Sequence, residues 1–155
     1  MDVPFRGRFE TKIDQKGRLS LPKNLLASFP QENSSVVITN SQYKGHRNLD
    51  VYLYSEWQKL EERIRRLSPL KTEVQDFQRF YLAGGQVVEP DANKRVLLPG
   101  PLRKYAAMKS EAVIVGMGNK LEIWSADIWN KLYGQLADNF ENTLAAVAAL
   151  DEESS

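Results

Sequence analysis

The sequence predicts a mainly β protein with peripheral α-helices, built from two related halves. Three observations support this prediction. A short basic hairpin occurs twice, a β-branched run follows each hairpin, and a tryptophan-bearing segment with helical spacing follows each run. Internal repetition of this kind indicates that one small unit has been duplicated. A chain of 155 residues suits one domain, or two small halves that share a core.

The first hairpin occupies residues 5–22. Residues 5–13 alternate loosely and contain Phe, Thr and Ile, which predicts a strand in the second half of this segment. Residues 14–17 predict a turn, because their glycine can adopt a positive φ. Residues 18–21 predict the return strand. A short helix with an apolar side is expected from Pro22, and Pro30 ends it.

The remainder of the first half predicts two strands and a helix. The β-branched run at residues 36–39 predicts a buried strand, and the polar residues 40–48 predict an exposed loop. Residues 49–54 predict the returning strand. Ser55 stands in the position of an N-cap with a capping box, ahead of an amphipathic helix over residues 56–67.

The second half repeats this order after a helical connector. A helix begins at Thr72 and stops at the Gly84-Gly85 pair. The elements expected after it are a strand at 86–88, a turn at 91–94, a strand at 95–98, a short helix at 99–108, strands at 112–115 and 120–124, a helix capped by Ser125 and an alanine-rich helix at 139–150. Residues 151–155 are expected to fray.

The repeat is strongest in the hairpins. Three residues of the first hairpin recur at an offset of 77 positions, namely Asp14 as Asp91, Arg18 as Arg95 and Pro22 as Pro99. At the same offset, residues 36–38 fall on residues 113–115. The offset then drops to 72, which aligns Trp57 with Trp129. Two such units are expected to bury their apolar faces against each other.

Composition narrows the classes of site that the chain can build. The sequence has no cysteine, which excludes disulfides and thiolate metal sites, and one histidine, His46, which excludes a multi-histidine metal site. We therefore expect no metal, no cofactor and no small-molecule substrate, and we expect that the chain is not an enzyme. The charged N-terminus and the lack of a bilayer-length apolar run predict a cytoplasmic protein.

Charge is unevenly distributed, although the net charge is only +1. Residues 1–24 contain six Lys or Arg against three acids. After Lys131 there is no basic residue, and five acids follow. The chain therefore has a basic head and an acidic tail, which create opposite fields.

The basic residues around the hairpins are candidate DNA contacts. Guanidinium groups suit phosphate and the O6/N7 edge of guanine, whereas lysines suit phosphate. The candidates are Arg6, Arg8, Lys12, Lys16, Arg18, Lys94 and Arg95. Arg8 and Arg18 are the candidates for base contacts, and Lys12 and Lys16 for phosphate contacts. Asp14 and Asp91 are expected to orient the hairpins through structural salt bridges to Arg18 and Arg95; the alternative is that they orient these arginines for DNA contact.

Other residues have ordinary structural interpretations. The tryptophans Trp57, Trp124 and Trp129 are expected in core or subunit packing rather than in base stacking. The cluster of Arg63, Arg65 and Arg66 is expected to form a solvated helix face or a subunit contact. His46 is expected on the surface.

The ordered set of motifs resembles the MraZ family of bacterial proteins. The resemblance rests on Phe-Arg-Gly-Arg-Phe at 5–9, Asp-Gln-Lys-Gly-Arg-Leu-Ser-Leu-Pro at 14–22 and Asp-Ala-Asn-Lys-Arg at 91–95, and it extends to about residue 140. It implies a duplicated swapped-hairpin β-barrel of the AbrB, MazE and MraZ type with pseudo-twofold halves. Lys94 stands where the first half has Gly17, so the two turns need not share a conformation.

The resemblance also implies a function. It implies a transcriptional regulator that binds short direct repeats in double-stranded DNA upstream of the division and cell-wall gene cluster, acts as a repressor of that operon and its own gene, associates with the nucleoid and forms a ring-shaped homo-oligomer. The alternative is an antitoxin-like protein-interaction ring without specific DNA binding. The expected boundaries are 5–60 for the first half, 61–84 for the connector, 85–133 for the second half and 134–155 for the C-terminal helix and acidic tail.

Overall fold

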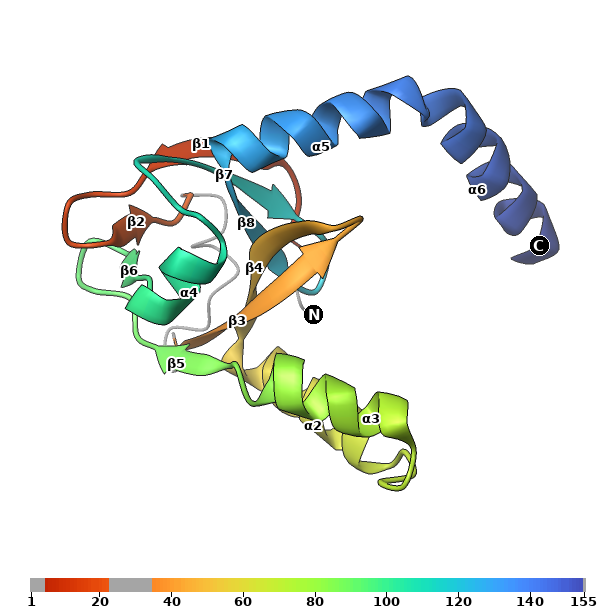
Figure 1. The fold of residues 1–155 in the computed structure, drawn as a ribbon, viewed down its shortest axis with the longest axis horizontal. Helices are drawn as coiled ribbons and strands as arrows, with labels where there is room; N and C mark the ends of the chain where they lie inside the picture. Colours follow the sequence, from red (N-terminus) through yellow and green to blue (C-terminus); the bar gives the residue numbers. More distant parts are fainter. Residues whose placement is uncertain (1–4, 23–34, 155) are drawn as a thin grey trace.

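A computed structural model of the chain describes residues 5–22 and 35–154 (Figure 1). The helix expected after Pro22 lies outside the described residues. The first half contains β1 (Arg8–Lys12), β2 (Arg18–Ser20), β3 (Val36–Tyr43), β4 (His46–Leu53) and α2 (Tyr54–Arg65). A connector follows, with α3 (Thr72–Phe77) and the π-helical turn η1 (Gln78–Leu82).

The second half repeats the predicted order of elements. It contains β5 (Gln86–Val88), β6 (Arg95–Leu97), α4 (Gly100–Tyr105), β7 (Glu111–Gly116), β8 (Leu121–Ser125), α5 (Ala126–Asp138) and α6 (Phe140–Ser154). The hydroxyl of Ser125 accepts a hydrogen bond from the backbone of Ile128 at 3.2 Å, so the predicted cap of α5 is confirmed. Helix α6 continues to Ser154, so the prediction of fraying from residue 151 was wrong.

The strands form two open antiparallel sheets rather than a closed barrel. One has six strands in the order β1-β7-β8-β4-β3-β5, and the other pairs β2 with β6. Strands of the two halves are interleaved, because β1 pairs with β7, β4 with β8, β5 with β3 and β2 with β6. The two halves therefore form a single interleaved core.

The strand register gives the repeat a pseudo-twofold axis. Leu19 pairs with Val96, its own equivalent at the offset of 77, and Asp50 pairs with Glu122, its equivalent at the offset of 72. Antiparallel pairing of a segment with its own repeat requires a local twofold axis at each of these pairs. Strands β3 and β7 are equivalent at an offset of 76, because Val36 pairs with Val88 where Ala112 pairs with Thr11. The alignment of residues 36–38 with 113–115 was therefore wrong by one residue.

The polar segment at residues 40–48 is not an exposed loop, and this prediction was wrong. Strand β3 continues through it to Tyr43, and β4 begins at His46. The two residues between them, Lys44 and Gly45, have φ values of 50° and 80°, which closes a tight hairpin. The paired strands satisfy the backbone of the polar residues, which is why polarity alone gave the wrong element.

Helix α2 begins without the predicted capping box. It starts at Tyr54, its N-cap is Leu53, and no side chain bonds to the N-cap position. Leu53 and Ser125 nevertheless occupy equivalent positions, at the offset of 72. The prediction that Ser55 caps this helix was therefore wrong, because the helix begins before Ser55.

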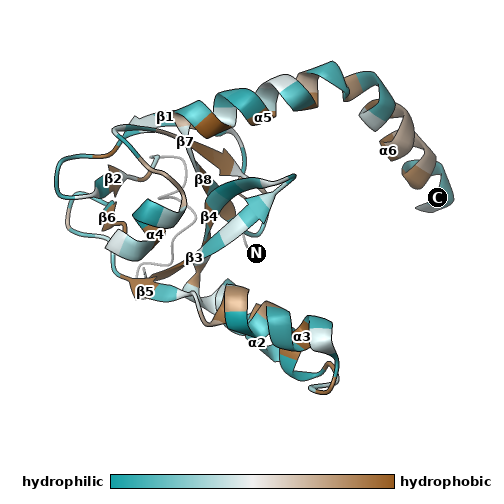
Figure 2. Cartoon of the chain, viewed as in Figure 1, coloured by the Kyte–Doolittle hydropathy of each residue, from teal (hydrophilic) through white to brown (hydrophobic). Residues whose placement is uncertain are grey.

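The main core lies between the two halves and draws on both. Its fully buried members include Leu19 and Val96 at one end of the pseudo-twofold axis and Ile38 and Ile114 on equivalent strands. Figure 2 shows apolar segments on β7 and β8, with hydrophilic residues toward the hairpin between β3 and β4 and along much of α5. Burial of these side chains from both halves explains why neither half is a separate domain.

A second cluster joins the connector to the first half. Trp57 on α2 packs against Tyr52 and Tyr81, with ring centroids 5.3 and 5.9 Å away. The equivalent groove in the second half has no such covering helix among the described residues. It is a cavity of about 470 Å³ between β1, β7 and α5, and its lining includes Trp129 and Tyr133.

A buried ionic network surrounds the pair of Asp50 and Glu122, where the pseudo-twofold axis passes between β4 and β8. The Asp50 carboxylate is fully buried and accepts hydrogen bonds from the Tyr81 hydroxyl and, at 2.9 Å, from the Lys120 ammonium group. Burial alone would lower the pKa of Lys120, but the neighbouring acidic groups, the Asp50 carboxylate foremost, outweigh burial and raise that pKa. Burial also raises the pKa of Glu122, the partner of Asp50 across the strands. Lys120 therefore compensates a carboxylate that has no access to water.

Two helical arms extend from the sheet region on separate sides (Figure 1). Helices α2 and α3 form one arm, and α6 follows α5 away from the body as the other. Within the described ranges, none of the helices is long and apolar enough to cross a membrane.

Candidate nucleic-acid interface

The first turn is held by one carboxylate. Oδ1 of Asp14 accepts hydrogen bonds from the backbone amides of Lys16 and Arg18, both at 2.9 Å. Oδ2 accepts from Nε of Arg18 at 2.8 Å. The backbone closes the turn through a bond of 3.0 Å from the Gly17 amide to the Asp14 carbonyl. Asp14 therefore orients both the turn and the guanidinium that it presents.

The second turn repeats this geometry bond for bond. Oδ1 of Asp91 accepts from the amides of Asn93 and Arg95 at 2.9 Å, and Oδ2 accepts from Nε of Arg95 at 3.0 Å. Lys94 has a φ of 60°, and Gly17 has a φ of 89°. The Gly-to-Lys difference therefore leaves the conformation shared, because Lys94 adopts the left-handed region that Gly17 occupies without strain.

The two turns lie side by side as one surface. They are joined by the β2–β6 pairing and by reciprocal backbone bonds, from Leu21 to the Lys94 carbonyl at 3.1 Å and from Leu98 to the Gly17 carbonyl at 2.9 Å. Nη1 of Arg95 also lies 4.0 Å from Oδ2 of Asp14. We call the surface formed by Lys16, Arg18, Lys94 and Arg95 the double-turn surface.

Both arginines on the double-turn surface are pre-oriented rather than neutralised. Their side chains are about one-third exposed, at 32% for Arg18 and 30% for Arg95. Each aspartate binds Nε, which leaves donors on the Nη atoms. Backbone hydrogen bonding from Arg18 lowers the pKa of Asp14 to about 2, and the equivalent bond from Arg95 lowers the pKa of Asp91. Both carboxylates are ionised near neutral pH, and the exposed Lys16 and Lys94 add net positive charge.

Arg103 is a further basic residue beside the first turn that the hairpin motifs did not predict. It lies on α4, and its Nε donates to the Leu98 carbonyl at 3.0 Å. Its guanidinium lies over Gly17, where an added Cβ would be 2.6 Å from the guanidinium carbon. The repeat gave no signal, because Leu26 stands at the equivalent position of the first half.

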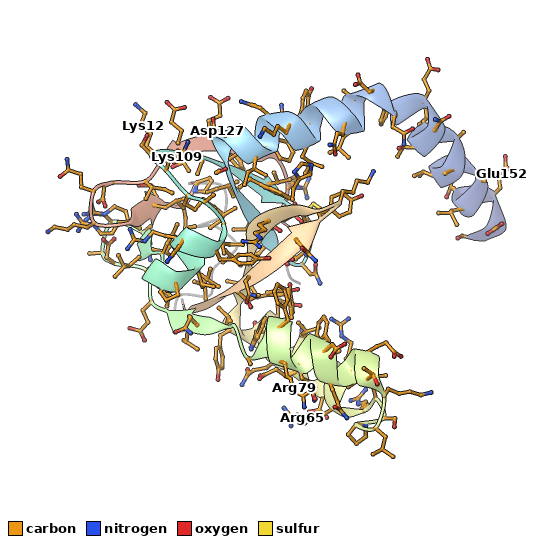
Figure 3. The ribbon with its side chains drawn as sticks, in the orientation of Figure 1. Lys12, Arg65, Arg79, Lys109, Asp127 and Glu152 are labelled. Carbon is orange, nitrogen blue, oxygen red and sulfur yellow. The ribbon has the colours of Figure 1, made fainter. Side chains whose placement is uncertain are left out.

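The remaining candidates are not part of the double-turn surface. Arg8 lies over the rings of Trp129 and Tyr133, with its guanidinium carbon 5.7 and 5.1 Å from the two centroids. Lys12 lines the same groove, and Figure 3 places it near Lys109 at the start of α5. Arg6 is exposed ahead of β1. Six of the seven basic candidates thus divide into a turn group and a groove group, and Arg6 belongs to neither.

The other predicted roles have mixed outcomes. Trp57 and Trp124 are buried, as expected for packing residues, and Trp129 is half-buried beneath Arg8. His46 is half-buried and makes a 3.1 Å hydrogen bond with the amide of Gln135. In the part of the chain that the structure describes, there is no cluster of three His, Cys, Asp or Glu side chains suited to a metal ion.

These features define a class of protein: a duplicated β-domain in which two Asp-held arginine turns meet about a pseudo-twofold axis. Comparison with known proteins identifies the family. Residues 5–80 and 81–150 each match the family model described as "MraZ protein, putative antitoxin-like". The chain belongs to the MraZ family.

Two curated relatives span almost the whole chain. A protein of Natranaerobius thermophilus named "Transcriptional regulator MraZ" is 34% identical over 151 residues, which are 95% of this chain and 99% of the relative. A protein of Heliobacterium modesticaldum with the same name is 32% identical over the same shares of the two chains.

Proposed function

We propose that this protein is a sequence-specific DNA-binding transcriptional regulator. The relatives that match nearly its full length are named as transcriptional regulators, which also agrees with the expectation that the chain is not an enzyme. The observation that carries the proposal is the double-turn surface. Two equivalent arginines are held there through Nε by carboxylates, with Lys16 and Lys94 beside them.

The paired turns suit a groove of double-stranded DNA. A two-stranded β-ribbon fits the major groove, and a fixed guanidinium can bind phosphate or the guanine edge. Within this proposal Arg18 and Arg95 contact bases or phosphates, Lys16 and Lys94 contact phosphates, and Asp14 and Asp91 orient the turns. Lys12, Arg6 and Arg8 contact DNA beyond the turns.

The assembly and the target are part of the same proposal. The exchange of strands between the halves supports a swapped-hairpin arrangement, with halves at 5–60 and 85–133, a connector at 61–84 and a C-terminal segment at 134–155. The protein forms a homo-oligomeric ring in the cytoplasm, at the nucleoid. It binds direct repeats upstream of the division and cell-wall genes, including its own gene, and represses them. Several weak sites then combine through effective concentration, which offsets the low net charge of the chain.

The second candidate is an antitoxin-like ring that binds a protein partner. The description of the family model as antitoxin-like favours it. Salt separates the two candidates, because each neutralised phosphate lowers log K by about 0.9 per log unit of salt. An apolar protein interface has a much weaker dependence.

A gel-shift titration against DNA upstream of the protein's own gene tests the proposal. We expect saturable binding that resists competitor DNA and weakens as salt rises. Arg18→Ala/Arg95→Ala should lose specific binding and keep its oligomeric mass. Arg79→Ala/Lys131→Ala removes the same charge from exposed positions on η1 and α5, and it should bind like the wild type. Unchanged binding by the double-turn variant, or no specific shift by the wild type, would contradict the proposal.

A further inference from the structure

Helix α6 exposes an apolar stripe along an arm of the molecule. All 15 residues of α6 are exposed. The apolar positions follow helical spacing on one face, and each is more than half exposed: Phe140, Leu144, Val147 and Leu150. A helix of this length spans about 22 Å. Figure 2 shows the apolar segments of α6 away from the sheet region.

Every charged residue of the same helix is acidic. It carries Glu141 and the run Asp151, Glu152 and Glu153, and the chain has no basic residue after Lys131. Asp151 lies on the face of the apolar stripe, because it is four residues beyond Val147. Pairing of α6 with α6 of another copy would bring like charges together, so the charge favours a basic partner surface.

The tip of the α2–α3 arm has the complementary character. Leu70 is 87% exposed and Leu67 is 50% exposed, which gives the tip an apolar centre. Arg65 and Arg66 have side chains that are 69% and 73% exposed, and Lys71 is exposed beside them. Glu62 contacts both arginines, and Glu73 is a second exposed acid, but the three basic residues outnumber these two acids and leave the tip net positive. Figure 3 shows Arg65 on this arm, far from Glu152 on α6.

We propose that α6 of one copy of this chain docks on the α2–α3 tip of a second copy. The two surfaces match in both respects, since an acidic helix with an apolar stripe meets a basic tip with an apolar centre. The arms project from separate sides of one molecule, so the contact forms between copies (Figure 1). The contact joins two different surfaces and is therefore heterologous. Heterologous contacts form a closed ring when the rotation from one copy to the next closes. This inference rests on the homo-oligomer of the proposed function and assigns its interface.

Two other basic surfaces fit α6 less well. The groove that contains Arg8 and Lys12 also contains Glu10 and Glu111, which cancel its charge. The double-turn surface is basic, but among the described residues of β2 and β6 only Leu97 is a large apolar residue that is exposed. The arm tip combines net positive charge with two exposed leucines.

Charge reversal with complementation tests the interface by light scattering. The first variant, Glu141→Lys/Asp151→Lys/Glu153→Lys, makes α6 basic; the second, Arg65→Glu/Arg66→Glu/Lys71→Glu, makes the tip acidic. We expect each variant alone to lose the wild-type mass. In an equimolar mixture every α6 again faces a tip of opposite charge, and the wild-type mass should return. Lys44→Glu/Lys109→Glu, with both reversals outside the two surfaces, should keep the wild-type mass.

Disulfide trapping gives an independent measurement, because the chain has no native cysteine. Mixed Leu70→Cys and Val147→Cys chains should form a cross-linked pair on mild oxidation, whereas Met117→Cys with Val147→Cys should not. Met117 is half-exposed and lies outside both surfaces.

The inference fails if either reversal keeps the wild-type mass, if the mixture stays dissociated, if the wild type is monomeric, or if the Leu70–Val147 cross-link is absent from the assembled protein. Circular dichroism confirms that each variant is folded. The outcome is separable from the proposed function: Arg18→Ala/Arg95→Ala tests DNA binding in an intact assembly, whereas the arm variants test the assembly with both turns intact.

Discussion

At the residue scale, Asp14 and Asp91 act as organisers of their turns. Each carboxylate accepts hydrogen bonds from two backbone amides and from one guanidinium nitrogen. The purely structural salt bridge and the arginine-orienting role, which the sequence left as alternatives, are therefore combined in one set of bonds. The same contacts that close the turn also fix the plane of the guanidinium.

The lowered pKa of Asp14 predicts a pH dependence. The pKa in the folded protein is about 2, against an ordinary value of 3.8. Because the folded pKa is depressed, the stabilising contribution is present above about pH 4 and is lost as pH falls toward 2. Asp14→Asn should flatten the pH dependence of the free energy of unfolding in this window, measured by urea denaturation. An identical pH dependence in the two proteins would contradict the assignment.

The buried pair of Asp50 and Lys120 predicts a non-additive effect on stability. Lys120→Met leaves the buried Asp50 carboxylate without its ammonium partner, which should cost about 3–5 kcal/mol. Asp50→Asn/Lys120→Met removes both charges and should be less destabilised than Lys120→Met. Urea denaturation of the two variants and of the wild type makes the comparison. A double variant at least as unstable as Lys120→Met would show that the ionic contact is not the cause.

At the scale of elements, the two turns show how different residues produce one conformation. Gly17 and Lys94 both have a positive φ, and their turns have the same hydrogen bonds. The difference lies in the space outside the backbone. Arg103 of α4 covers Gly17, so a side chain at position 17 would displace the Arg103 guanidinium, whereas Lys94 is exposed to solvent.

This asymmetry gives a matched pair of variants. Gly17→Ala places a Cβ in the left-handed region and against the Arg103 guanidinium, so we expect a loss of at least about 1–2 kcal/mol. Lys94→Ala keeps an existing Cβ and should change stability by less than about 0.5 kcal/mol. Urea denaturation measures both free energies. A loss in Gly17→Ala no larger than that in Lys94→Ala would contradict the requirement for glycine at position 17.

The two tryptophan-bearing helices differ in how they are covered. The connector α3–η1 packs on Trp57 of α2, whereas Trp129 of α5 is contacted by Arg8 beside an open groove. The sequence repeat aligned the two tryptophans correctly at an offset of 72 but gave no indication of this difference. A connector follows only the first of the two helices, so the asymmetry originates in chain order.

At the scale of the whole molecule, the pseudo-twofold axis concentrates charge. It brings Lys16 and Lys94, 78 positions apart in the chain, to one surface although the net charge is only +1. The acidic α6 lies on a separate arm (Figure 1). The fold thus separates a basic surface from an acidic one within a nearly neutral chain.

This separation predicts the salt dependence of DNA binding. Lys16→Ala/Lys94→Ala should reduce the slope of log K against log salt by about 1–2 units per chain, since each lost phosphate contact removes about 0.9. Lys44→Ala/Lys131→Ala removes two exposed lysines from other elements and should leave the slope unchanged. Gel shifts over a series of salt concentrations measure the slope. A reduction of equal size in the control would assign the slope to net charge rather than to the turns.

The sequence by itself determined the repeat, the order of the elements and the two Asp–Arg turns, because these features depend on local spacing. Tertiary structure alone decided which strands pair. In the tertiary structure the polar residues 40–48 form a hairpin, and helix α2 begins without a cap from Ser55. Arg103 lies over Gly17, and Arg8 lies away from the turns. The physical reason is that strand pairing satisfies backbone groups through partners distant in the chain. Local polarity and spacing therefore do not specify which surface a side chain reaches.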